Sequence, residues 1–231
     1  EGVSHCVSTN QEQYGPCRIG PAYPLFFERT EPIPIGPQSI RDPNGTCVPV
    51  YRYSHDQAAK LLWETEEYAK MTTCFQEGCD MLEPVVKTLE ADRRANAEEL
   101  LGVARFIENT ARTTVHVKRW HALKWKLGIS PDPYPVWVGG RKGMADAIPI
   151  VAPEKSAEDE ESVLAELVAI AEAEIRNAEA TIALVERHSR LGYTQELDYC
   201  TSPEQLRWKI AVTRRAIAEE ILPRFVSVRT R

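Results

Sequence analysis

A repeating apolar pattern between Ser156 and Arg190 constrains the fold more than any other stretch of this sequence. The apolar residues recur at alternating steps of four and three, the spacing that lines one face of an α-helix. A helix of that span is about 50 Å long at a rise of about 1.5 Å per residue. Alone it would leave its apolar seam in water, so it needs partner helices. The seam consists of Leu164, Val168, Ala171, Ile175, Ala178, Ile182 and Val185.

The opposite side of this predicted helix is charged, and we expect it to face water. Residues 158–190 are strongly acidic, whereas residues 112–126 are basic. Either the acidic and basic helices face each other, or both present solvated faces. The charged residues expected on the wet side are Glu166, Glu172, Glu174, Arg176, Glu179 and Glu186.

Partner helices can be read on both sides of this stretch. Ser54 and Gln57 form a capping box, and apolar residues at helical spacing follow as far as Leu89, with Pro84 as a point of kinking or interruption. A break or tight reversal is expected at 92–96. A second helix is expected over 96–127, where Gly128 closes it.

The last predicted helix opens at Ser202, with Pro203 in its first turn and Gln205 at the third position. Pro223 is expected to stop this helix. Residues 225–228 then form a short terminal piece that can pair with the N-terminal arm.

Residues 1–53 contain half of the chain's 16 prolines. Proline at this density forbids long helices and most ladder pairing. We therefore predict an extended arm over 1–53 that has no core of its own and lies on the helices or on another domain. Residues 54–231 are predicted to form an all-α fold, an antiparallel bundle of about four long helices with a long irregular loop at 128–157.

Composition narrows the classes of function. A net charge of -6 argues against a general nucleic-acid surface, and no run of about 18 apolar residues exists to span a membrane. The six cysteines match no zinc spacing, so we expect mostly free thiols, with a Cys6–Cys17 bridge as the most plausible exception. We expect no metal and no cofactor. A soluble chain is expected, in an extracytoplasmic or cytoplasmic compartment of bacterial type, and its N-terminal Glu1 suggests processing or excision from a larger protein.

Two stretches have the composition of a ligand site. Arg18 and Tyr23 lie in a Gly/Pro-rich stretch, 14–24, and can offer donors and an aromatic face to a sugar or carboxylate. The alternative is a rigid arm that its aromatic residues anchor to the helices. In the second stretch, an aromatic and basic wall of a ligand cleft is expected, or else tryptophans packed under the 128–157 loop. That stretch contains His116, Trp120, His121 and Trp125.

A third polar group surrounds Arg190 and Tyr193, between the last two predicted helices. We expect these residues either to provide further contacts to a ligand or to form hydrogen bonds that connect the last two helices. Ser189 follows His188 directly, and neighbours on a helix do not point at each other as a catalytic triad requires. Acidic residues are abundant, and no particular acid/base pair can be selected.

Three segments together resemble the helical region that follows the catalytic barrel in some large bacterial proteins of glycoside-hydrolase type. They are 14–24, 112–127, and 189–193 followed by Trp208-Lys209-Ile210. The resemblance contains no catalytic motif, and the chain has no alternating strand and helix pattern of a barrel. It implies that the acid/base carboxylates lie on a separate barrel, while this chain braces that barrel and contributes to the rim of a glycan site.

The leading hypothesis is therefore a helical accessory domain of a carbohydrate-active hydrolase, non-catalytic by itself. Its expected partner is an N-terminal catalytic domain or another protein chain, with a glycan as a further ligand. One alternative is a helical protein-binding or oligomerisation module. The other is a self-contained hydrolase that uses the wall formed by His116, Trp120 and His121.

Overall fold

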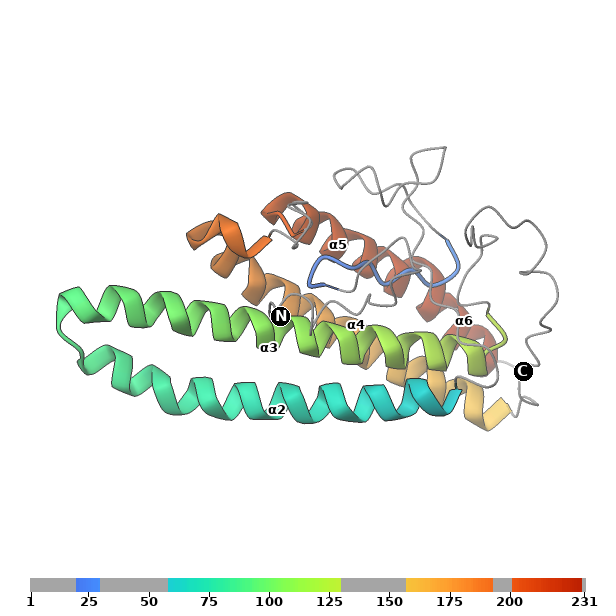
Figure 1. The fold of residues 1–231 in the computed structure, drawn as a ribbon. Coiled ribbons are helices and arrows are strands. Elements are labelled where there is room, and N and C mark those ends of the chain that lie inside the picture. Colours follow the sequence, from blue (N-terminus) through green and yellow to red (C-terminus); the bar gives the residue numbers. More distant parts are fainter. Residues whose placement is uncertain (1–19, 30–57, 130–156, 193–200, 230–231) are drawn as a thin grey trace, which may run out of the picture.

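The computed structural model describes residues 20–29, 58–129, 157–192 and 201–229 (Figure 1). All regular structure in these ranges is helical, which confirms the all-α prediction. The elements are α2 (Ala58–Thr88), α3 (Ala91–Lys126), α4 (Ala157–Arg187), the 3-10 helix η4 (Ser189–Gly192), α5 (Pro203–Arg215), the π-helix η5 (Ala216–Ile221) and α6 (Leu222–Arg229).

Helix packing follows the order of the chain. α2 and α3 form an antiparallel hairpin, α3 packs along α4, and α4 packs along the rod made by α5, η5 and α6 (Figure 1). Arg–Glu ion pairs between helices accompany this packing and fit the expectation that acidic and basic helices face each other. These pairs are Arg119–Glu166, Arg187–Glu98, Arg207–Glu186, Arg214–Glu179, Arg224–Glu160 and Arg229–Glu161.

The apolar seam of α4 lies in the interior, as predicted. Leu164, Ala171, Ala178 and Val185 are buried, whereas the seam residues between them are half-buried at its edge. The buried face is wider than the seam, because Leu167 and Ile170 are buried too.

The prediction that Glu174 faces water is wrong, because its side chain is fully buried. Glu174 lies one turn beyond Ile170 and one turn before Ala178, so it points in the same direction as these buried residues. The charge pattern suggested a wet face, but the helix position decides where the side chain points.

Two predicted boundaries are wrong in the hairpin. The chain reverses at Leu89–Glu90 rather than at 92–96, and α3 begins at Ala91 rather than near 96. The Arg94 side chain donates from Nε and Nη2 to the Leu89 carbonyl, at 2.9 and 2.7 Å, and so closes the reversal. α2 continues through Pro84 to Thr88.

Pro223 does not stop the last helix, which continues to Arg229. Because proline has no N–H, the usual bond to the carbonyl four residues earlier is lost. The preceding turn is π-helical instead, and the Leu222 N–H donates to the Ile217 carbonyl five residues back. The chain absorbs the missing donor by widening before the proline. Residues 225–228 are therefore helical, which contradicts the expected terminal piece paired with the arm.

The start of the last helix is confirmed. The Ser202 side chain accepts from the Gln205 N–H at 3.1 Å, and the Gln205 side chain accepts from the Ser202 N–H at 2.9 Å. The capping box predicted at Ser54, the loop at 130–156 and most of the arm 1–53 lie outside the described residues.

Residues 20–29, here called the core segment, are the part of the predicted arm that the structure describes (blue in Figure 1). The segment has no helix or strand, yet all residues from Tyr23 to Phe27 are buried. Tyr23, Leu25 and Phe27 join the main apolar cluster of α3, α4 and η5. This part of the arm lies on the helices, as one of the two expectations stated.

Gly128 ends α3 in the left-handed conformation, with φ 69°. The next N–H, of Ile129, donates to the Lys124 carbonyl at 2.9 Å, which is the glycine-closed helix end that the sequence predicts.

We expect Gly128→Ala to lower the free energy of unfolding by about 1 kcal/mol, because a Cβ is strained at this φ. Gly78→Ala is the matched control in α2, where an added Cβ meets nothing within 4 Å. It should raise stability by about 0.5–1 kcal/mol. Urea unfolding of both variants checks the opposite signs.

Candidate functional site

The interior of the protein contains an ionised cluster centred on Glu174 of α4. Lys209 of α5 forms an ion pair with its Oε1, and the Thr113 hydroxyl of α3 donates to the same oxygen at 2.6 Å. His116 of α3 donates from Nδ1 to Oε2, since a carboxylate only accepts. We call Thr113, His116, Glu174 and Lys209 the Glu174 cluster. It joins α3, α4 and α5 at one point.

Lys209 also connects this cluster to the core segment. Its Nζ donates to the Pro21 carbonyl at 2.6 Å, and its side chain is 1% exposed. One ammonium group therefore holds a carboxylate of α4 and a main-chain oxygen of the core segment together.

The electrostatics of the cluster favour the ionised carboxylate. Burial raises the pKa of Glu174, but the Lys209 ammonium and the His116 hydrogen bond outweigh burial and lower the pKa to about 2. Burial lowers the pKa of Lys209, and the attraction of Glu174 partly offsets this effect. A buried carboxylate that stays ionised is a poor general acid, because it holds no proton to donate at neutral pH.

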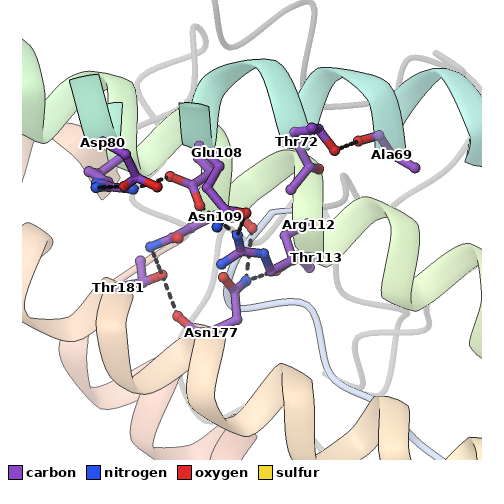
Figure 2. Close-up of polar contacts among 12 residues, drawn as sticks. Ala69, Thr72, Asp80, Glu108, Asn109, Arg112, Thr113, Asn177 and Thr181 are labelled. Atoms are coloured by element: carbon purple, nitrogen blue, oxygen red, sulfur yellow. Dashed lines mark hydrogen bonds and ion pairs between the residues drawn. The ribbon is translucent and has the colours of Figure 1, made fainter. Parts of the chain in front are cut away.

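A ladder of amides and hydroxyls continues from this cluster between α3 and α4 (Figure 2). Asn177 Nδ2 donates to the Asn109 carbonyl at 2.8 Å and to the Thr113 hydroxyl at 2.9 Å. Asn109 Nδ2 donates to Thr181 Oγ1 at 3.0 Å, and the Thr181 hydroxyl donates to the Asn177 carbonyl at 2.8 Å. The interface between these two helices is therefore polar along its middle.

A second charged group joins α3 to α2. Arg105 donates to Asp80 at 2.6 Å and to the buried carboxylate of Glu108 at 2.9 Å. Arg112 pairs with the other oxygen of Glu108 and reaches Gln76 of α2 at 3.3 Å (Figure 2). Two arginines thus neutralise one buried glutamate in the hairpin.

The residues predicted to bind a ligand lie in different environments. Tyr23 and Trp120 are buried in the same apolar cluster, and the Trp120 Nε1–H donates to the Phe26 carbonyl at 2.9 Å. His121 is buried, and burial followed by the charges of Lys124 and Lys118 lowers its pKa to about 3. It is therefore neutral at physiological pH.

His116 belongs to the Glu174 cluster, whereas Arg190 is exposed and pairs with Glu99 at 3.2 Å. Arg18 and Tyr193 lie outside the described residues. The structure therefore places Tyr23 and Trp120 in one apolar cluster and Arg190 apart from them, in η4. A ligand role for all seven residues remains a prediction.

The sequence interpretation missed Glu174 as a member of the interior and did not single out the Asn109–Asn177 pair. A usable signal existed in the helical spacing. Lys209 lies between Leu206 and Ile210 on the buried stripe of α5, as Glu174 does on that of α4. A lysine and a glutamate on two buried stripes indicate a buried ion pair.

Other features of the described residues offer little chemistry. They contain no group of three or more histidine, cysteine or acidic side chains that could hold a metal ion. Cys74 and Cys79 are free thiols, as expected. An open groove between α4 and the α5–η5 rod is lined by Glu172, Ile175, Arg176, Glu179, Arg214 and Ile217.

None of the helices in the described ranges has the length and apolar character needed to cross a membrane. Comparison with known family models, curated proteins and solved structures gives no match to this chain.

Proposed function

We propose that this chain is a non-catalytic helical module that braces another domain of a larger carbohydrate-active hydrolase. Its helices would form the antiparallel bundle that the sequence predicts, closed by the Pro-rich arm. The resemblance of 14–24, 112–127 and 189–193 to helical regions of glycoside-hydrolase-type proteins supports the carbohydrate part of this proposal.

The observation that carries the bracing role is an apolar surface on the α2–α3 hairpin. On α2, Met81 is 74% exposed, and Leu82 and Val85, which follow it closely in sequence, are more than half exposed; on α3, Leu100 is 71% exposed. We call these four residues the hairpin patch. The turn end of this hairpin extends past the other helices in Figure 1. Large apolar side chains that a helical hairpin leaves exposed favour a contact surface for a partner.

The buried ionisable groups are structural and do not supply a catalytic acid or base. Glu174 and Lys209 are fully buried and bonded to each other, and Glu108 is held by two arginines. Groups that hold helices together and are closed to solvent cannot reach a glycoside bond.

The first test is turnover by the purified chain. We expect no hydrolysis of a panel of aryl glycosides above the buffer rate, and turnover that disappears in a His116→Ala or His121→Ala variant would establish the self-contained hydrolase instead.

The second test concerns the contact surface. We expect the catalytic domain encoded with this chain to bind it in trans, and Met81→Ser/Val85→Ser to weaken that binding at least about 10-fold. The matched control is Leu222→Ser/Val226→Ser, which removes exposed apolar side chains from α6. Equal loss in both variants would contradict a specific role of the hairpin patch.

An oligomerisation module is the second candidate, since the same exposed side chains could pair two copies of the chain. Light scattering separates the two. A stable dimer that Met81→Ser/Val85→Ser dissociates would favour self-association, whereas a monomer that binds the catalytic domain supports the brace.

A further inference from the structure

The core segment is held in the manner of a bound peptide. Its residues 23, 25 and 27, at alternate positions, belong to one apolar cluster. Tyr23, Leu25 and Phe27 enter the apolar cluster of α3, α4 and η5, whereas Phe26 points to Trp208 of α5. The Phe27 ring meets Trp120 edge-on at 6.3 Å, and the Phe26 ring meets Trp208 edge-on at 6.1 Å. Two tryptophans on two helices therefore contact successive residues of the segment.

The helices also bind the main chain of the segment. Trp120 Nε1 and Lys124 Nζ both donate to the Phe26 carbonyl, at 2.9 Å each, and Lys209 Nζ donates to the Pro21 carbonyl. A buried extended chain without strand partners needs such contacts, because its polar groups would otherwise be unpaired. Backbone contacts of this kind give affinity to peptide-binding sites, and pockets for alternate side chains give specificity.

The π-helix η5 provides the last main-chain contact. The Glu220 carboxylate accepts from the N–H groups of Glu28 and Arg29, at 2.9 Å each. Arg29 also reaches Glu219 at 3.5 Å. Isolated π-helical turns occur frequently at functional sites, and here the turn places two adjacent acidic side chains at the end of the segment.

We propose that the residues of α3, α5 and η5 that contact the core segment form a peptide-binding site. Its ligand is an extended peptide with apolar side chains at alternate positions, and residues 20–29 occupy it as a ligand supplied in cis. Lys124, Trp120, Lys209 and Glu220 recognise the main chain, while the apolar cluster recognises the residues at positions 23, 25 and 27.

The covalent connection explains how such a ligand stays in place. Residues 30–57 join the segment to α2, and a tethered ligand acts at an effective concentration in the millimolar range. A free peptide should therefore displace the native segment poorly. It should bind well when a substitution has weakened the contacts of the segment with the helices.

The test uses the full chain with a weakened segment, Phe27→Ala, and a labelled synthetic peptide of residues 20–29. We expect saturable binding by fluorescence anisotropy and a rise in Tm of about 5 °C at saturating peptide, since a ligand of the folded state stabilises it. The wild-type chain should bind the peptide at least about 10-fold more weakly. The control peptide carries serine at positions 25 and 27 and should bind at least about 10-fold more weakly. A folded Phe27→Ala chain that neither binds the peptide nor gains Tm overturns the proposal.

A second measurement covers the case in which Phe27→Ala does not fold. Hydrogen exchange is followed in Glu220→Gln, which keeps every apolar contact of the segment and weakens only the contact to Glu28 and Arg29. Excess peptide should accelerate exchange of amides in 22–29 and leave those of α5 unchanged. If these amides exchange only when those of α3 and α4 exchange, and added peptide does not change this, the segment is an inseparable part of the core. That result would overturn the proposal.

Discussion

Replacing Glu174 with glutamine is expected to lower the free energy of unfolding by about 3–5 kcal/mol. The change leaves the ammonium of Lys209 buried without a counter-charge, and an uncompensated buried charge costs this much. The neutral amide also gives Thr113 and His116 a weaker acceptor than a carboxylate. Urea unfolding at pH 7, followed by circular dichroism, measures the loss.

Glu172→Gln is the matched control, two residues away on the exposed side of the same helix. It makes the same chemical change and should alter stability by no more than about 0.5 kcal/mol. A loss below about 1 kcal/mol for Glu174→Gln would contradict a stabilising role for the ion pair.

The effect of Glu174 should also depend on pH in one direction. Its pKa in the folded protein is about 2, below the ordinary value of 4.5, so the folded state favours the ionised form. Above about pH 4.5 this group makes its full contribution to the free energy of unfolding. The contribution is lost as the pH falls from there toward about 2. The difference in free energy of unfolding between wild type and Glu174→Gln should therefore be constant near neutral pH. It should become smaller as the pH falls from about 4.5 to about 2.

Replacing Trp120 with alanine is expected to cost about 3–5 kcal/mol, the usual range for a buried tryptophan. Its side chain is 1% exposed, meets Phe27 and donates to the Phe26 carbonyl. The change therefore opens a cavity and removes one of the two side-chain donors to the Phe26 carbonyl.

Trp63→Ala in α2 removes the same side chain from a position that is 62% exposed, and should change stability by less than about 1 kcal/mol. Thermal and urea unfolding of the two variants measure the difference. Similar losses in both would mean that the interior contacts of Trp120 contribute little.

Helical periodicity predicted the fold class and the interior position of α4, because Leu164, Ala171 and Ala178 repeat on one face. The charge pattern failed at Glu174, because helix position and not residue charge decides which side chains are buried. Glu174 occupies a buried helix position, and only a partner at a distant place in the chain, Lys209, makes that burial acceptable. The spacing within α4 alone does not report this partner, which emerges only when the buried stripe of α5 is compared with that of α4.

Pro223 was misleading as a local stop signal, because the π-helical turn before it accommodates it and the helix continues to Arg229. The arm was predicted to lie on something, but the contacts of Pro21 and Phe26 depend on lysines about 100 or more residues away. Of the predicted ligand residues, Tyr23 and Trp120 form part of the interior, and for Tyr23 this fits the alternative that aromatic residues anchor the arm to the helices.

The amide and hydroxyl ladder between α3 and α4 determines how these two long rods can be aligned. Leucine and alanine surfaces tolerate sliding, because one apolar contact replaces another. A shift of α4 by one turn, about 5.4 Å, would break the bonds of Asn177 to Asn109 and Thr113 and the bond of Asn109 to Thr181 at the same time. Each would leave a buried polar atom unpaired, so a single longitudinal alignment of the two helices is far lower in energy than its neighbours.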